Sequence, residues 1–318
     1  MGVSIVIPNY NGKKFLEACI NSLINQTLQP QEIIIVDNDS KDGSIEYIED
    51  NFKDKVTLIC LDKNYGFSKA VNEGIKRSKS EFTVLLNNDT EQDERWLEEL
   101  VKCIKKDEKI FSCCSQMLRF TERDIIDDAG DEYTMMGWGN KIGDGKPASD
   151  YDEDREVFSS CAGAAIYRTK IIEEIGLFDE DFFAYLEDMD ISLRARVYGY
   201  KNYYASKAKV YHIGSATSGS RHNSFKVKLA ARNNIYLIYK NMPNLQIAIN
   251  FIFIFMGIII KWIYFCLKGF GRDYIKGVFE GLRNKKKINR IKLKNNLFNY
   301  IDIEKKILKN TLNLLKWG

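Results

Sequence analysis

Short apolar runs alternate with amphipathic stretches along the first 120 residues. Residues 82–86 are apolar and partly β-branched, as in a strand buried on both faces of a parallel sheet. Residues 13–26 instead carry apolar side chains at helical spacing. Strands that alternate with helices predict parallel pairing through right-handed crossovers. The predicted strands are residues 3–8, 32–36, 56–61, 82–86 and 110–117, and the predicted helices are residues 13–26, 44–51 and 68–78.

Three of these strands end in polar clusters, namely Pro8-Asn9-Tyr10, Asp37-Asn38-Asp39 and Asn87-Asn88-Asp89. Parallel strands bring their carboxyl ends to one edge of a sheet, where α/β proteins bind nucleotides. A carboxylate there can hold Mg²⁺ or Mn²⁺ against a diphosphate, although each cluster alone is also typical of a solvated turn. No Gly-x-Gly-x-x-Gly follows the first strand and the sequence has no P-loop motif, which disfavours dinucleotide and P-loop sites.

Four segments carry a resemblance to a known family: VSIVIPNYNG, IIIVDNDSKDGS, NYGFSKAVNEGI and LLNNDT, in this order within the first ninety residues. Together they resemble the inverting glycosyltransferase family 2, and in particular its rhamnosyltransferase-like branch. The resemblance implies a GT-A fold, an open and mostly parallel α/β sheet flanked by helices. It also implies a nucleoside diphosphate sugar as donor and Mn²⁺ or Mg²⁺ as cofactor.

The same resemblance implies roles for residues at the strand ends. Asp37 would contact the nucleotide base, and Asp89 would bind the metal on the diphosphate. The common metal motif of the family is Asp-x-Asp, so Asn87 leaves one negative charge fewer and implies weaker metal affinity. The residues predicted to line the donor site are Pro8, Tyr10, Asp37, Asp39, Asn64, Asn72 and Asn88.

Residues 179–190 contain six carboxylates interleaved with aromatic side chains. A helix that starts near residue 186 would tolerate acids in its first turn because its dipole favours negative charge. Aromatic neighbours would also desolvate an acid and raise its pKa, which suits a general base. The stretch resembles the Glu-Asp motif of the family, which implies that Asp188, beside Glu187, deprotonates the acceptor hydroxyl. Arg194 and Arg196 receive no catalytic role.

His212 lies 24 residues beyond Asp188, at the end of a predicted short strand. A lone histidine is more often a structural residue than a metal ligand. Family members with a histidine at this separation use it as a metal ligand, so the resemblance predicts this role for His212. His222 is expected in a surface loop.

Residues 119–158 are polar and glycine-rich, and too long for an idle connection. Two interpretations remain open for them: a loop or lid on the acceptor side, or a disordered surface excursion.

The composition is that of an ordinary globular protein, with 45% apolar and 29% charged residues among 318. Seven cysteines without a Cys-x-x-Cys spacing favour a reducing cytosol over a disulfide framework or a zinc site. Residues 268–318 carry 14 Lys and Arg against 4 Asp and Glu; since the chain is +3, residues 1–267 carry −7. The basic end predicts an anionic partner, and the apolar run before it favours a lipid surface over nucleic acid.

That apolar run, residues 245–267, is long enough to cross a bilayer. Gln246, Asn250 and Lys261 disfavour a clean span, so an interfacial or re-entrant helix is preferred. A buried helix of a second small domain and a homodimer interface are the alternatives. The chain is therefore divided into a catalytic domain, residues 1–222, and a helical, membrane-associating extension, residues 223–318.

The sequence thus predicts a metal-dependent inverting glycosyltransferase at the cytoplasmic face of the cell membrane. It would move a sugar, with rhamnose suggested by the branch, to a hydroxyl of a glycan or polyprenyl-linked acceptor in cell-surface polysaccharide synthesis. A nucleotidyltransferase acting on sugar phosphates is an alternative, but residues 9–13 lack its glycine-rich basic loop. A non-catalytic membrane scaffold is the other alternative.

Overall fold

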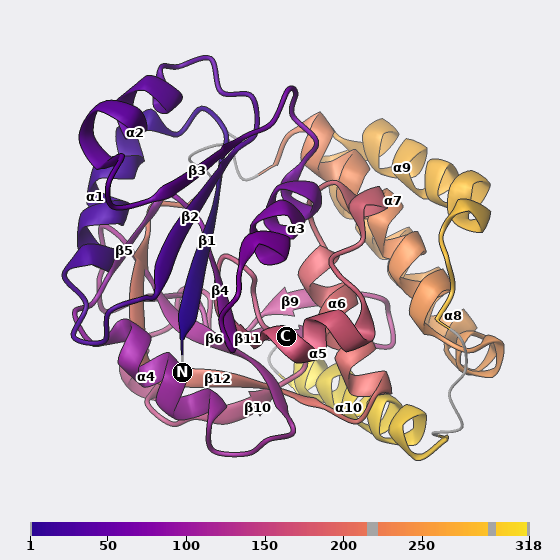
Figure 1. The fold of residues 1–318 in the computed structure, drawn as a ribbon. Helices are drawn as coiled ribbons and strands as arrows, with labels where there is room; N and C mark the ends of the chain where they lie inside the picture. The colour runs from indigo at the N-terminus through magenta and orange to yellow at the C-terminus, as the bar shows by residue number, and fades with distance from the viewer. Residues whose placement is uncertain (1, 215–221, 292–296, 317–318) are drawn as a thin grey trace.

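A twisted sheet runs through the molecule, with helices on both faces and the last helices stacked along one side (Figure 1). The computed structural model describes residues 2–214, 222–291 and 297–316. The predicted parallel part of the sheet is present, with adjacent strands in the order β4-β1-β2-β3. These strands are β1 (Val3–Asn9), β2 (Glu32–Asp37), β3 (Thr57–Cys60) and β4 (Phe82–Leu86).

Beyond β4 the sheet becomes mixed. The predicted fifth strand forms as β6 (Ile110–Arg119), but β11 (Ala164–Arg168) lies between β4 and β6 and is antiparallel to both. The long strand β12 (Lys201–His212) then pairs with β6 in parallel. The sheet is therefore mostly parallel around the predicted donor edge, with an antiparallel insertion that sequence periodicity alone does not reveal.

Two apolar clusters fill the two faces of the sheet. On one face pack α1 (Lys13–Ile24), α2 (Ser44–Phe52) and α4 (Trp96–Ile104). On the other face pack α3 (Phe67–Arg77), α5 (Thr169–Ile175) and α6 (Glu187–Val197), and the 3-10 turn η2 (Glu180–Phe182) precedes α6. Helical apolar spacing thus produces the covering layers that the buried strands require.

The glycine-rich middle of the chain is ordered, so the prediction of a disordered excursion is wrong. It contributes β7 (Ile126–Asp128), which pairs with β6, and a hairpin of β8 (Asp131–Tyr133) and β9 (Gly139–Lys141). The turn η1 (Ala148–Tyr151) and edge strand β10 (Arg155–Val157) complete it. Short strand β5 (Thr90–Gln92) pairs with the end of β12.

The last helices are α7 (Ser224–Asn241), α8 (Asn244–Leu267), α9 (Gly271–Asn284), η3 (Lys285–Lys287) and α10 (Leu297–Lys316). α7 shares an apolar cluster with α6, so residues 223–241 add to the core beside the predicted catalytic helix. The division of the chain at residue 222 stays a prediction.

Among the described residues, α8 is the one helix long and apolar enough to cross a membrane by length and composition. Only 17% of its most apolar window is buried, so the interpretation as a buried helix is wrong.

Candidate functional site

The polar strand ends do converge at one edge of the sheet. Asn9 at the end of β1 donates to Asp37 Oδ2 at the end of β2 over 2.7 Å, and Asn88 beyond β4 donates to Asn9 Oδ1 over 2.6 Å. Asp37 is fully buried, and its other oxygen accepts the Ser40 N–H at 2.8 Å. Both Asp37 oxygens therefore organise the loops of this edge, and its contact with a base stays a prediction.

The remaining predicted donor residues divide into two groups. Asn64 joins the edge, since its Oδ1 accepts from Asn38 Nδ2 at 3.1 Å. Asn72 does not, because its amide donates to Phe178 O at 2.8 Å and accepts from Phe178 N at 3.0 Å. It ties α3 to the segment before α6, and its predicted contact with the nucleotide gains no support. Pro8 is half-buried in β1, whereas Tyr10 is exposed and Asp39 pairs with a lysine, Lys41, beside this edge.

The two predicted metal ligands face each other. The pairing of β5 with β12 sets His212 opposite Thr90, which brings its Nε2 to 3.5 Å from Asp89 Oδ1. Both side chains are nearly buried, with 12% and 7% of their surface exposed. The other imidazole nitrogen, Nδ1, lies 2.7 Å from Asp127 Oδ2. Burial lowers the pKa of His212, but the bonds to Asp127 and Asp89 outweigh it and raise the pKa to about 9.

This pair fits a divalent cation in its donor chemistry. An imidazole and a carboxylate are ligands that Mn²⁺ accepts, and a carboxylate on the far nitrogen is the usual way a ligating histidine is oriented. In the described ranges, no three His, Cys, Asp or Glu side chains gather closely enough to hold a metal ion themselves. Phosphate oxygens and water would therefore complete the coordination, as they do in many Mg²⁺ and Mn²⁺ sites.

A lysine absent from the sequence prediction connects this pair to the predicted base. Lys141 of β9 lies 3.1 Å from Asp127 Oδ1 and 3.9 Å from Asp128 Oδ2. Burial raises the pKa of Asp128 to about 6, assisted by Asp127 and Asp188, while Lys141 opposes the rise. Lys141 also lowers the pKa of Asp188. Contacts thus run from Asp89 through His212 and Asp127 to Lys141, whose charge acts on Asp188.

Asp188 lies at the start of α6, as predicted. Its Oδ1 accepts the Met189 N–H at 2.7 Å and its Oδ2 the Ala162 N–H at 3.4 Å. Burial raises its pKa above the ordinary carboxyl value although both N–H groups and Lys141 oppose the rise. Neighbouring Glu187 is buried, its pKa is raised by burial and by Asp188, and its Oε2 has no hydrogen-bond partner.

The segment before Asp188 has a strained backbone. Phe183, Tyr185 and Leu186 have positive φ angles of 64°, 70° and 66°, which cost about 1–3 kcal/mol each in non-glycine residues. The buried Asn233 of α7 holds this segment, since its Nδ2 lies 2.8 Å from Phe182 O and Tyr185 O. Asn233 Nδ2 also donates to Ala184 O at 2.9 Å. These bonds hold the strained segment that immediately precedes Glu187 and Asp188.

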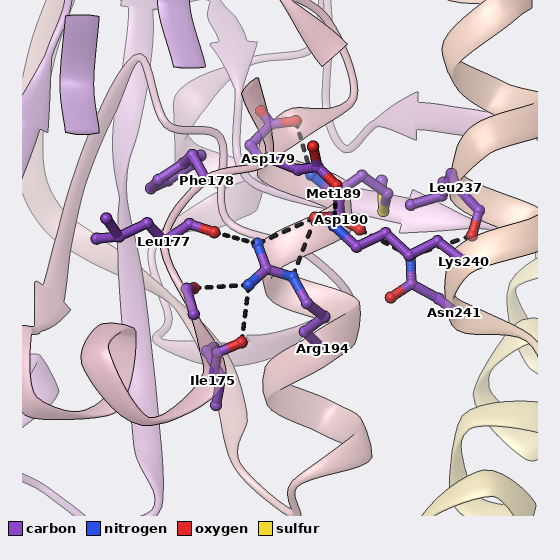
Figure 2. Close-up of polar contacts among 12 residues, drawn as sticks. Ile175, Leu177, Phe178, Asp179, Met189, Asp190, Arg194, Leu237, Lys240 and Asn241 are labelled. Carbon is purple, nitrogen blue, oxygen red and sulfur yellow. Dashed lines mark hydrogen bonds and ion pairs between the residues drawn. The ribbon is translucent and has the colours of Figure 1, made fainter. Parts of the chain in front are cut away.

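A buried ionic network locks α6 to α7 (Figure 2). Asp190 accepts from Arg194 Nε at 3.0 Å, Lys240 Nζ at 2.9 Å and Asn241 Nδ2 at 2.8 Å. Arg194 also donates to the carbonyls of residues 175–177, and Lys240 pairs with Asp179. The loop before Asp188, the helix α6 and the helix α7 are therefore held together by one buried ionic network.

The chain is similar in sequence to a known protein family and to several of its members. The family model described as glycosyl transferase family 2 matches residues 4–176. The uncharacterized glycosyltransferase YwdF of Bacillus subtilis is 31% identical over 61% of this chain and 68% of its own length. The O-antigen biosynthesis protein RfbC of Myxococcus xanthus is 26% identical over 68% of this chain but only 17% of its own length.

A solved structure of similar fold is the mannosyltransferase PcManGT from Pyrobaculum calidifontis in complex with GDP-Man and Mn²⁺. It aligns with a TM-score of 0.56 at 13% identity, over 89% of this chain and 87% of that one. This chain spans 33%, 26% and 38% of the lengths of three further curated relatives. Since the family model covers more than half of the chain, and the sheet is of GT-A type, the protein belongs to glycosyltransferase family 2.

Proposed function

We propose that the protein is a metal-dependent inverting glycosyltransferase that uses a nucleoside diphosphate sugar. The observation that carries this proposal is the set of contacts from Asp89 through His212, Asp127 and Lys141 to the field of Asp188. It supports a cation-binding pair and a desolvated acid at opposite ends of one site. Rhamnose is the lead sugar through the branch resemblance, and uridine and guanosine diphosphate sugars are the other donors to test.

In this proposal Asp188 accepts the proton of an acceptor hydroxyl while that oxygen attacks the anomeric carbon from the face opposite the diphosphate. Its raised pKa suits proton abstraction, because a carboxylate of higher pKa is a stronger base. The oxygen–carbon bond forms as the bond to the diphosphate breaks, so the anomeric configuration inverts. A cation bound by Asp89 and His212 would neutralise the charge on the diphosphate.

The role of Lys141 follows from its position between the two ends of the site. Its ammonium keeps Asp128 partly ionised and holds Asp127 against His212. It therefore orients the histidine through Asp127 while moderating the negative field around Asp188. Lys141 acts on groups that touch the substrates and is a positioning residue.

Nucleotide release is the first test. Purified protein is incubated with dTDP-rhamnose, UDP-sugars and GDP-mannose, each with Mn²⁺ and with chelator. The proposal expects release from one donor class that depends on the metal, and ¹H NMR of the product should show inverted configuration at the anomeric carbon. Release that is indifferent to chelator, or a retained configuration, would refute it.

The helix α8 supports docking on a membrane. Its polar residues share one face, where Gln246 and Asn250 donate to Glu304 of α10 over 2.7 and 2.8 Å. From Leu245 to Leu267 the outward face is therefore predominantly apolar. The large apolar side chains exposed on α8 are Leu245, Ile249, Phe251, Ile252, Phe253, Phe255, Met256, Ile259, Ile260, Trp262, Ile263, Tyr264 and Leu267.

The same contacts favour a helix that lies in the plane of the membrane. α8 is about 36 Å long at 1.5 Å per residue, and it packs beside the charged helices α9 and α10. A span across the bilayer would pull these helices into hydrocarbon, at a cost of a few kcal/mol per charge. α9 adds exposed Arg272, Lys276 and Arg283 around Phe279, which suits an anionic lipid surface.

Vesicle sedimentation tests this docking. The rings of Phe251 and Phe255 stack on the exposed face with their centroids 6.3 Å apart. Burial of each side chain in lipid would stabilise binding by about 2 kcal/mol. The variant with both changed to Ser should lose binding to phosphatidylglycerol vesicles and remain folded. Wild-type protein found wholly in the supernatant would refute the proposal that α8 docks on a membrane. A concentration-dependent dimer that the double variant abolishes would favour a second copy as the occupant.

A further inference from the structure

Lys261 is the only charged residue between residues 245 and 267. Its Nζ lies 5.5 Å from the centroid of the Trp138 ring. No carboxylate of the described chain lies within ion-pair distance of it, and burial lowers the pKa of its ammonium to about 8. Lys261 is half-buried, and a half-buried cation over an aromatic ring without a counter-charge is a position that an external anion would stabilise.

This position is built by close contact between α8 and the β8–β9 hairpin. The Trp138 indole N–H donates to Gly257 O at 3.2 Å. A Cβ at Gly257 would lie 2.2 Å from Met136 O, so only glycine allows the hairpin to approach the helix this closely. Lys261 is one turn along from Gly257 and lies on the same side of the helix. The hairpin and the lysine therefore hold fixed positions relative to each other.

The same hairpin leads directly into the proposed catalytic site. Trp138 precedes β9, and Lys141 at the end of β9 contacts Asp127. Trp138 and Lys141 are three residues apart, which is about 10 Å along an extended strand. On the other side of Lys261 lies the apolar face of α8, where a hydrocarbon chain would rest.

We infer that Lys261, beside Trp138, binds the diphosphate of a lipid-linked acceptor whose hydrocarbon chain lies along α8. This inference rests on the proposed function and names its acceptor class. The first sugars of such an acceptor would extend along the hairpin toward Asp188. Anionic lipid headgroups offer the same phosphate chemistry, so the experiment separates the two sources.

Full-length protein is sedimented with three kinds of vesicle: phosphatidylcholine alone, phosphatidylcholine with a few mole per cent of polyprenyl diphosphate, and phosphatidylcholine with phosphatidylglycerol. The variants are Lys261→Met, Lys261→Arg and the matched control Lys268→Met. Lys268 also lies over an aromatic ring, 5.9 Å from Tyr264, but at the exposed end of α8 away from the hairpin. Circular dichroism confirms that each variant is folded.

Polyprenyl diphosphate should increase wild-type affinity, and Lys261→Met should reduce this gain by at least about tenfold because a charge-assisted hydrogen bond is lost. Lys261→Arg and Lys268→Met should keep it. A gain that survives in Lys261→Met overturns the inference. An equal loss toward phosphatidylglycerol also overturns it and assigns Lys261 to headgroups. Nucleotide release by the wild type needs no vesicle, so failure of the proposed function would be seen separately.

Discussion

The substitution Asp190→Asn should destabilise the protein strongly. Asp190 is fully buried and accepts from Arg194, Lys240 and Asn241. Asparagine removes the charge and turns an NH₂ group toward these donors. Within the described residues, Arg194 loses its one carboxylate partner and Lys240 keeps Asp179 alone. Removing one partner from a buried ionic network costs about 3–5 kcal/mol, out of a typical total of about 5–15 kcal/mol.

Urea unfolding followed by tryptophan fluorescence measures this loss as a lower midpoint at an unchanged slope. The matched control is Asp302→Asn, because Asp302 is 61% exposed and lies 3.8 Å from Lys306. An exposed pair of this kind contributes about 0–1 kcal/mol. A loss for Asp190→Asn no larger than that of the control would refute the reasoning.

The pH dependence of the stability provides a second test of the role of Asp190. Burial raises the pKa of Asp190, but Lys240, Arg194 and Asn241 outweigh it and leave the pKa below the ordinary value. A carboxyl whose pKa is lowered by folding stabilises the protein fully above its unfolded pKa, and the stabilisation disappears as the pH falls through the folded pKa. The difference between wild type and Asp190→Asn should therefore be constant from neutral pH to about pH 5 and shrink below about pH 4.

Three further predictions concern the site. Asn233→Leu should release the strained segment before the base and lower kcat at least about tenfold with donor affinity unchanged, measured by steady-state kinetics and donor titration. Asp127→Asn should weaken Mn²⁺ binding about 10–100-fold by freeing His212, measured by calorimetry without substrate. Lys141→Met should move the acid limb of the kcat/KM profile to higher pH, because Lys141 lowers the pKa of Asp188. An unchanged kcat in Asn233→Leu, or donor affinity that falls together with kcat, would contradict the first prediction. An unchanged Mn²⁺ affinity in Asp127→Asn would contradict the second. An acid limb of the kcat/KM profile that stays at the same pH in Lys141→Met would contradict the third.

The sequence was sufficient for features that depend on local pattern. Strand and helix periods placed β1 to β4 correctly, and the rule that parallel strands end at one edge brought Asn9, Asp37 and Asn88 together. The helix start before Asp188 was also predictable from its flanking carboxylates.

Features that depend on distant pairing could not be predicted from local pattern, and the meeting of Asp89 with His212 was predicted only through the family resemblance. Asp127 reaches His212 because β7 and β12 both pair with β6, a register that no local spacing encodes. Asn233 supports a segment about fifty residues earlier in the chain, and its amide gave no signal. By contrast, Gln246 and Asn250 are one helical turn apart, so the sequence already placed both on one face of the helix, and both donate to Glu304.

The central claim is that Asp89 and Asp188 serve two ends of one site. Isothermal titration of the identified donor with Mn²⁺, paired with turnover, tests it in Asp89→Ala and Asp188→Asn. Both variants should lose turnover, but only Asp89→Ala should lose donor affinity, while Asp188→Asn should bind the donor as the wild type does. Turnover by Asp188→Asn near the wild-type rate, or full donor affinity in Asp89→Ala, would contradict the account.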